Sequence, residues 1–263
     1  MGSIVPKFCT DCFVGNDVLY DQEMENPLLQ EVPVKSRSKS KKSSFEMIDT
    51  SEPLPQDQEY LLRLVEAASL EFLNHLSEEE ALEHVVSKNG VSVYSGDSAD
   101  GYIIKAVWKV PFSSQEFISF VRNTQHRKSW DKKIEEIKVV EEPLPDLKII
   151  YSKYKKMMMV SQRDAVTVNK SLYMNKGSLL VGTSCEHPSC PPSKDVIRAK
   201  IDVSGYYAEP IEPDSEGNTT KVVNLIIGSF GGKLPKKMIK KVMASSLPKF
   251  AQTLNEEIQK SLN

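Results

Sequence analysis

Residues 234–263 read LPKKMIKKVMASSLPKFAQTLNEEIQKSLN, and this stretch predicts one long amphipathic helix at the end of the chain. Pro235 suits a first helical turn, because the N–H that proline lacks would have no helical partner there. Pro248 removes one hydrogen bond in mid-helix, so we expect a kink or a division at that point. The apolar residues that recur at helical spacing are Ile239, Val242, Met243, Leu247, Phe250, Leu254, Ile258 and Leu262.

Lysines gather in the first half of this helix, at Lys236, Lys237, Lys240 and Lys241. One interpretation is a surface helix that packs on a sheet and turns a solvated lysine face to water. The other is a helix that covers an apolar cavity and touches a membrane surface with its lysines. The sequence that precedes the helix has to decide between them.

The composition is that of a soluble globular protein: of 263 residues, 40% are apolar and 27% are charged. A net charge of −2 argues against a nucleic-acid partner. No apolar run reaches the length of about 18 residues that a membrane span needs, and the first residues lack the apolar run of a signal peptide. Four cysteines in a chain of this length favour a reducing compartment. We therefore expect a cytoplasmic monomer without a cofactor.

Residues 1–53 predict a disordered tail or linker, and residues 54–263 predict one folded domain. The tail is interrupted by prolines and contains a basic, serine-rich run over residues 35–42. Such a run is either a solvated linker or a patch that binds a membrane surface and is released when its serines are phosphorylated.

The first residues carry candidate lipidation sites. Myristoylation at Gly2 together with palmitoylation at Cys9 or Cys12 would supply the two signals that stable membrane anchoring needs. Pro6 departs from the motif, which has Ser or Thr at that position. The alternatives are an unmodified tail, or a zinc site that the two cysteines share with residues 185–190; spacing alone is weak evidence for zinc, and we predict no metal.

The remaining chain predicts helices and strands in an α+β order. A capping box at Ser77–Glu80 predicts a second helix through Val86, which Asn89-Gly90 would end. The expected helices cover residues 56–76, 77–86, a segment opened by Ser113-Ser114, and the last stretch; the expected strands cover residues 91–94, 102–110, 147–154, 165–173, 178–184, 196–203, 206–211 and 220–230. A curved antiparallel sheet closed by one amphipathic helix can enclose a cavity.

Two strands give further information. Residues 196–203 alternate strictly, which predicts one dry face and one wet face. Residues 222–227 are apolar on both faces except at Asn224. A buried Asn needs a partner, which is either protein or a ligand.

Five local strings now occur in the order and spacing of a known family. They are His126-Arg-Lys-Ser-Trp-Asp131, Ser161-Gln-Arg-Asp164, Glu186-His-Pro-Ser-Cys-Pro-Pro192, Val196-Ile-Arg-Ala-Lys200 and Gly231-Gly-Lys-Leu-Pro235. From about residue 54 to its end the chain resembles the START family, the steroidogenic-acute-regulatory-related lipid-transfer domains. The resemblance implies a helix-grip fold, in which an antiparallel sheet wraps around the C-terminal helix and encloses a tunnel for one lipid. It also implies that this helix acts as a lid that opens at a membrane.

The resemblance bears on the type of lipid. Arg127 stands where phosphatidylcholine carriers of the family bind phosphate, but the places of their choline-binding aromatic residues hold Ser152 and Ala165. The ceramide pattern keeps only an acid, Asp131, because the other two places hold Ser152 and Gly182, and the acid–arginine pair of the sterol carriers is replaced by Ser152 and Asn169. This favours a phospholipid with a non-choline or variable head group. Arg127 can instead form an ordinary ion pair with Asp131 four residues on.

We therefore expect a non-enzymatic protein that binds one lipid and transfers it between membranes. The predicted lipid-binding residues are Arg127, Asp131, Ser152, Tyr154, Asn169, Asn224, Ile239, Val242 and Met243, and the predicted membrane contacts are the four helix lysines. A sterol or ceramide carrier, and a membrane-tethered lipid sensor or adaptor, are the alternatives. An enzyme would need His126 or His187 beside Asp131 or Glu186, but no nucleophile–base–orienter set is visible. Arg163-Asp164 is expected to be structural.

Overall fold

A computed structural model gives the structure of the chain and describes residues 56–76, 82–156, 161–232 and 235–263. The predicted tail of residues 1–53, with Gly2, Cys9 and Cys12, lies outside the described residues. The backbone of the last helix is described, but the side chains of Lys236, Lys237, Lys240 and Met243 are not among the described ones.

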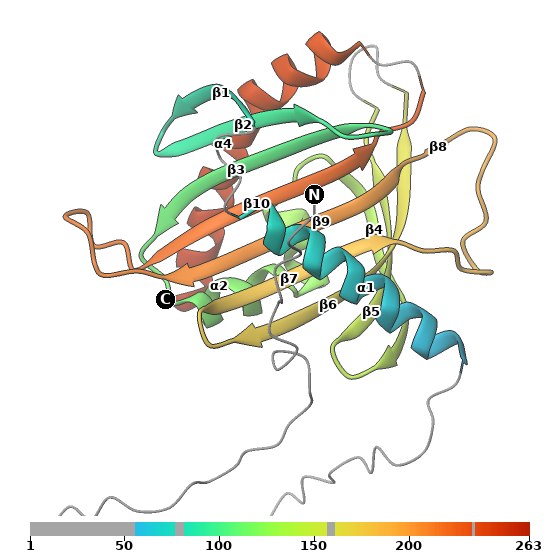
Figure 1. Cartoon of the computed structure of the whole chain (residues 1–263), viewed down its shortest axis with the longest axis horizontal. Coiled ribbons are helices and arrows are strands. Elements are labelled where there is room, and N and C mark those ends of the chain that lie inside the picture. Colours follow the sequence, from blue (N-terminus) through green and yellow to red (C-terminus); the bar gives the residue numbers. More distant parts are fainter. Residues whose placement is uncertain (1–55, 77–81, 157–160, 233–234) are drawn as a thin grey trace, which may run out of the picture. The chain divides into compact units, whose positions relative to one another are not determined.

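The strands of the described residues form one curved, ten-stranded sheet (Figure 1). They are β1 (Glu83–Lys88), β2 (Val91–Asp97), β3 (Tyr102–Val110), β4 (Ile134–Leu144), β5 (Leu147–Tyr154), β6 (Arg163–Met174), β7 (Gly177–Ser184), β8 (Ile197–Arg198), β9 (Lys200–Pro210) and β10 (Thr220–Ser229). The order is β1-β2-β3-β10-β9-β7-β6-β5-β4, with antiparallel neighbours throughout, and the short β8 pairs in parallel with β6. The path ends at β1 and β4, so the sheet is open and does not close into a barrel.

Helices cover both faces of this sheet. They are α1 (Gln56–Asn74), α2 (Ser114–Val121), the short α3 (Arg127–Trp130) that follows a 3-10 turn at Thr124–His126, and α4 (Lys236–Leu262). In Figure 1, α1 crosses one face over β6, β7 and β9, and α2 and α4 lie on the opposite face. None of the helices in the described ranges is long and apolar enough to cross a membrane.

The two helix layers explain why β10 is apolar on both faces. Val223, Leu225 and Ile227 join the core beneath α1, whereas Val222 joins the core beneath α2 and α4. Both cores are dry: Phe72 of α1 and Leu254 of α4 are fully buried. Apolar burial on both sides therefore holds the central strands between the helices.

Local signals position the helices as predicted. Ser113 caps α2, and the Glu116 side chain accepts a hydrogen bond from the Ser113 backbone N–H, which completes a capping box. α4 runs through Pro248 without being divided. Its apolar stripe is buried at Leu247, Leu254 and Ile258, as the sequence period predicts.

The predicted second helix is wrong where the structure describes it. Residues 83–88 form strand β1, which pairs with β2 in a hairpin. Asn89 and Gly90 have φ angles of 53° and 72°, so both central residues of the turn are left-handed. This is the backbone that a tight hairpin requires, and Asn-Gly is the dipeptide that favours it. The dipeptide closes a hairpin here instead of ending a helix.

Two other features of the sheet differ from the prediction. β4 was not predicted, and its pairing with β5 is interrupted by register shifts that break the alternation of a strand. Residues 200–210 form one strand instead of two, with a bulge at Asp202, because Val203 pairs with Ile227 and Ile201 pairs with Gly228. The bulge turns Val203 towards the α1 core, so residues 196–203 do not keep one dry face throughout.

Candidate functional site

A cavity of about 350 Å³ lies between the inner face of the sheet and α4. Its described lining includes Arg127, Asp131, Ser152, Tyr154, Asn169, Asn224, Ile239 and Val242, which are eight of the nine residues predicted to bind lipid. The ninth, Met243, has a side chain outside the description. The structure therefore brings together residues that are more than a hundred positions apart in the sequence.

Strand alternation selects the side chains that line the cavity. Ser152 of β5 is opposite Ala165 of β6, and Tyr154 is opposite Arg163. Every second residue along the two strands faces inward. The inward residues are Lys148, Ile150, Ser152 and Tyr154 on β5, and Arg163, Ala165, Thr167, Asn169 and Ser171 on β6.

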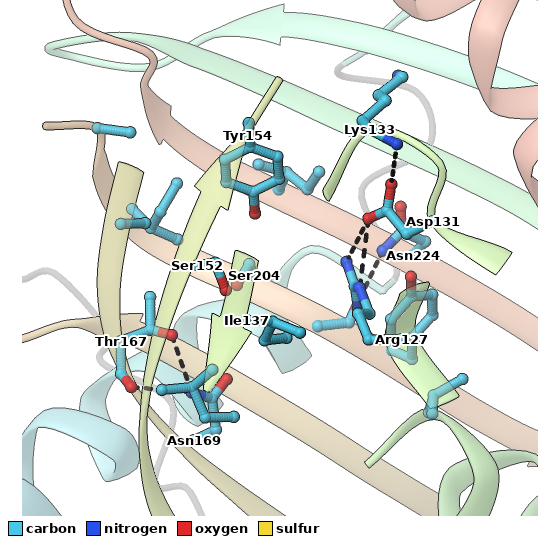
Figure 2. Close-up of a pocket in the computed structure, with 18 of the residues that line it drawn as sticks. Arg127, Asp131, Lys133, Ile137, Ser152, Tyr154, Thr167, Asn169, Ser204 and Asn224 are labelled. Atoms are coloured by element: carbon cyan, nitrogen blue, oxygen red, sulfur yellow. Dashed lines mark hydrogen bonds and ion pairs between the residues drawn. The ribbon is translucent and has the colours of Figure 1, made fainter. Parts of the chain in front are cut away.

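Arg127 and Asp131 form an ion pair on the cavity wall (Figure 2). The Nε and Nη2 atoms of Arg127 donate to one carboxylate oxygen of Asp131 at 3.2 and 3.0 Å. The other carboxylate oxygen accepts from the backbone N–H of Lys133 at 3.2 Å. The guanidinium also lies over the ring of Trp130, 4.2 Å from its centre. The ion pair expected from the four-residue spacing is present, and it lies inside the cavity.

The surroundings keep Arg127 charged. Burial disfavours the charged guanidinium, but Tyr206, Asp131 and Tyr154 outweigh burial and raise the pKa of Arg127. Burial raises the pKa of Tyr206 to about 12, and it also raises the pKa of Tyr154. Both phenols therefore keep their protons at neutral pH and can donate hydrogen bonds into the cavity.

Lys133 connects the Arg127–Asp131 ion pair to α4. Its Nζ donates to the hydroxyl of Ser246 on α4 at 3.0 Å. Burial lowers the pKa of Lys133, although Asp131 opposes the shift. On the same side, the ring of Trp130 packs edge-on against Phe250 of α4, with ring centres 5.5 Å apart. The cavity wall around Arg127 is thus in direct contact with α4.

A second polar group lies on the strands of the cavity, apart from Arg127 in Figure 2. The amide nitrogen of Asn169 donates to the backbone oxygen and the hydroxyl of Thr167 at 3.0 and 2.9 Å. The hydroxyl of Ser204 donates to the backbone oxygen of Gly182 at 3.5 Å, and Gly182 pairs with Asn169. Gly182 leaves room for Asn169, because a Cβ at Gly182 would lie 2.1 Å from the side-chain oxygen of Asn169.

Asn224 has a protein partner and also lines the cavity. It is 5% exposed, and its amide nitrogen donates to the backbone oxygen of Gly205 at 2.8 Å. The two possibilities raised by the sequence, a protein partner and a place on the ligand cavity, therefore occur together.

Arg163 and Asp164 point to opposite sides of β6. Asp164 is held by Arg198 through two hydrogen bonds of 2.8 and 3.0 Å, away from the cavity lining. Arg163 lines the cavity and donates to the backbone oxygens of Phe230 and Gly231 at 2.9 and 3.2 Å. Burial lowers the pKa of Arg163. The pair thus contributes to structure, as expected, but one of its members also faces the cavity.

Sequence reasoning missed several lining residues, among them Lys133, Thr167, Ser204 and Tyr206. Thr167 could have been found, because it lies between the inward positions 165 and 169 on the same strand. Ser204 and Tyr206 could not, because the bulge at Asp202 changes which residues of β9 face inward.

The other predicted residues do not belong to the described cavity. Lys241 is exposed on α4, and the side chains of the other three helix lysines are not described. The enzyme alternative finds its candidate groups in separate interactions: Asp131 holds Arg127, whereas His187 contacts Glu141 at 2.9 Å and accepts from the Ser189 N–H.

Comparisons with known proteins agree with this architecture. A family model described as START domain matches residues 62–262. The chain is 24% identical over 148 residues to the mitochondrial steroidogenic acute regulatory protein of Oncorhynchus mykiss, covering 56% of this chain and 51% of that protein. It is 25% identical over 139 residues to StAR-related lipid transfer protein 5 of Bos taurus, covering 51% of this chain and 63% of that protein. These matches span about half to two thirds of the length of the curated relatives.

Solved structures show the same fold. Human StAR-related lipid transfer protein 5 superposes with a TM-score of 0.71 at 21% identity, covering 78% of this chain and all of that one. Human STARD10 superposes with a TM-score of 0.65 at 21% identity, covering 81% of this chain and 83% of that one. The curved antiparallel sheet and its C-terminal helix are thus the helix-grip fold. Since the family model covers most of the folded part, the chain belongs to the START domain family.

Proposed function

We propose that this protein binds one phospholipid in its cavity and transfers it between membranes without covalent chemistry. The observation that carries the proposal is the half-buried, charged Arg127 on the cavity wall. A planar guanidinium suits a phosphate group, because its N–H groups can bond two oxygens at once. Family membership and a relative named StAR-related lipid transfer protein 5 support the same class of function.

The charges of the lining favour an anionic head group. The described lining contains six Lys or Arg residues and two acidic residues, which leaves an excess of positive charge; these are Arg122, Arg127, Lys133, Lys148, Lys155 and Arg163 against Asp131 and Asp146. A choline head group would add another cation. Ser152 and Ala165, in the places of the choline-binding aromatic residues, offer no cation–π partner.

The size of the cavity implies that α4 moves during loading. A cavity of about 350 Å³ lies at the lower end of the roughly 300–1,000 Å³ of ligand pockets, so a two-chain phospholipid would need more room. Ile239 and Val242 of α4 line the cavity, so an outward movement of α4 would enlarge it. Exposing that apolar face to water costs about 25 cal/mol per Å², and a bilayer interface offsets the cost.

Contact of α4 with a membrane is therefore part of the proposed function. Lys236, Lys237, Lys240 and Lys241 would attract the helix to anionic lipids. The protein would act as a cytoplasmic monomer, with transient membrane contact through α4 or a tail anchored through Gly2, Cys9 or Cys12.

The first experiment is native mass spectrometry of the purified protein, followed by extraction and identification of the bound lipid. A glycerophospholipid that is lost in Arg127→Gln and kept in Arg63→Gln supports the proposal. Arg63 is a matched control, because it forms an exposed ion pair with Glu59 at the same four-residue spacing but lies on α1. A sterol or a ceramide in the wild-type protein would overturn the phospholipid assignment.

A sterol-sized cargo is the second candidate, and the small volume of the cavity favours it. A membrane-tethered sensor or adaptor is tested by deleting residues 1–45 and measuring how much protein is recovered with membranes. Unchanged recovery would contradict a role of the tail in anchoring.

A further inference from the structure

Arg163 is a buried cation whose hydrogen-bond partners among the described residues are all uncharged. It is 8% exposed, lies at the start of β6, and lines the cavity. Its guanidinium donates to the backbone oxygens of Phe230, Gly231 and Ser161. These bonds use three of its five N–H groups, and within the described part of the chain the other two are left for another acceptor.

The other arginines of the cavity wall are neutralised by acids. Arg127 is paired with Asp131, and Arg122 is paired with Asp146. Among the residues that the structure describes, Arg163 forms no ion pair with an acid, although the adjacent Asp164 is bound to Arg198. A buried charge with only neutral partners is costly, and an anion beside it recovers part of that cost.

The position of Arg163 links it to α4. Phe230 and Gly231 belong to the segment that leads from β10 into α4. Gly231 and Gly232 both have a φ of 69°, a left-handed backbone that glycine adopts without strain. A Cβ at Gly231 would lie 2.6 Å from the side chain of Ile197, so the turn packs closely on the strand beside Arg163. The guanidinium thus holds two carbonyl groups of the segment that follows β10.

This end of the cavity is distinct from its polar end at Asn169. Six residues along β6 separate the two side chains, which corresponds to about 20 Å at roughly 3.3 Å per residue. Met238 and Ile239 of α4 line the cavity at its other wall. A lipid that passes beneath the start of α4 therefore meets Arg163 along its path.

We propose that Arg163 forms an oxyanion-binding subsite at the α4 end of the cavity, where the phosphate of a passing lipid binds and loosens the segment before α4. Hydrogen bonds from a guanidinium to phosphate are roughly twice as strong as neutral ones. A phosphate that binds the two remaining N–H groups therefore draws the guanidinium away from the backbone oxygens of Phe230 and Gly231. Release of these oxygens frees the glycine turn, and α4 can move. The subsite rests on the proposed function, since its ligand is the head group of the cargo.

The test compares Arg163→Lys and Arg163→Gln with wild type and with Lys153→Gln. Lys153 is a suitable charge control, because it lies on β5 next to Tyr154 but pairs with Glu135 and is absent from the cavity lining. Transfer of fluorescent phosphatidic acid and of fluorescent phosphatidylcholine from phosphatidylcholine vesicles is measured for each protein. Melting temperatures show which variants remain folded. Arg163→Lys keeps the positive charge, so it remains usable for the test if Arg163→Gln does not fold.

We expect Arg163→Lys to slow the transfer of phosphatidic acid by about three- to tenfold, because a lysine cannot reproduce the planar fork. Phosphatidylcholine should be slowed much less, because its phosphate offers fewer free oxygens and lies beside its own choline cation. Hydrogen exchange of residues 228–240 should rise when wild type meets phosphatidic acid vesicles, and it should be high in Arg163→Gln without vesicles. Equal slowing of both lipids, or exchange that does not respond to phosphatidic acid, overturns the subsite.

A soluble probe separates the two possible sources of phosphate. Glycerol phosphate should raise the exchange of residues 228–240 in wild type if a free phosphate suffices, and should have no effect if the phosphate must arrive on a lipid. A rise in exchange, whether it is caused by glycerol phosphate or by phosphatidic acid vesicles, supports the subsite if it is lost in Arg163→Lys and kept in Lys153→Gln. The proposed function fails separately, when extraction finds no phospholipid while the response at Arg163 persists.

Discussion

Replacing Asp131 by Asn should destabilise the empty protein and strengthen its binding of anionic phospholipid. Asp131 is 4% exposed, and one of its carboxylate oxygens accepts both hydrogen bonds of Arg127. Asn has nearly the same size, so the cavity keeps its shape, but the negative charge beside the guanidinium is lost. Arg127 then has only an amide oxygen or a phosphate as an acceptor.

The magnitude follows from the bonds. A hydrogen bond to a charged group contributes about 1.5–3 kcal/mol, so the loss of charge and of one good acceptor should lower the free energy of unfolding by about 2–3 kcal/mol. For a domain of this size each kcal/mol lowers the melting temperature by about 2–4 °C, which predicts a decrease of roughly 4–12 °C. The phosphate no longer has to compete with Asp131, and we expect an affinity about tenfold higher, equivalent to about 1.4 kcal/mol.

Thermal unfolding with and without vesicles of phosphatidic acid measures both effects. Saturating lipid should remove most of the difference in melting temperature between wild type and Asp131→Asn, because the phosphate takes the place of the carboxylate. The control is Glu59→Gln, which breaks an exposed ion pair of the same spacing and should change stability by less than about 1 kcal/mol. If Asp131→Asn loses both stability and affinity, Asp131 orients Arg127 for the lipid, and the competition argued above is wrong.

Three further predictions concern other parts of the molecule. Gly182→Ala should lower the free energy of unfolding by about 1–3 kcal/mol, because the added Cβ overlaps Asn169. The loss should nearly vanish when Asn169 is also changed to Ala. A double-mutant cycle of melting curves checks this, and equal losses in both backgrounds would contradict it. Burial raises the pKa of Cys185 to about 11 from 9.0. At pH 8 its alkylation by iodoacetamide should therefore be about 100-fold slower than that of a free thiol of pKa 9.0. Peptide mass spectrometry measures the rate, and a rate similar to that of the free thiol would show that Cys185 is not protected. Changing Lys236, Lys237, Lys240 and Lys241 to Gln should slow transfer from anionic vesicles and reduce its dependence on salt, whereas unchanged rates at low salt would argue against docking through α4.

The parts of the fold that could be predicted have strong local signals. The apolar period of residues 236–262 is a property of neighbouring turns, and it predicts α4 and its buried face whatever it packs against. The capping box before α2 and the alternation of β3 and β5 are local in the same way. Eight of the predicted site residues line one cavity; Arg127 and Asp131 belong to a motif that carries the family resemblance, and the other six lie on strands and on α4.

The errors occur where one local signal fits two structures. Asn89-Gly90 can end a helix or close a hairpin, and pairing of residues 83–88 with β2 decides for the hairpin. β4 is an edge strand with charged residues and register shifts, so its sequence lacks the alternation of a buried strand. Contacts with distant residues decide the structure in both cases.

The sequence by itself determined that this chain forms a curved antiparallel sheet with a long apolar-faced helix, and it offered an Arg127–Asp131 ion pair as one alternative, because periodicity and four-residue spacing are local properties. Only the tertiary structure decided which side chains face the cavity. The bulge at Asp202 reverses the inward face of β9, and the guanidinium of Arg163 finds the carbonyl groups of Phe230 and Gly231 nearly seventy residues away. Both depend on register between strands and on the path of the chain, which no local pattern encodes.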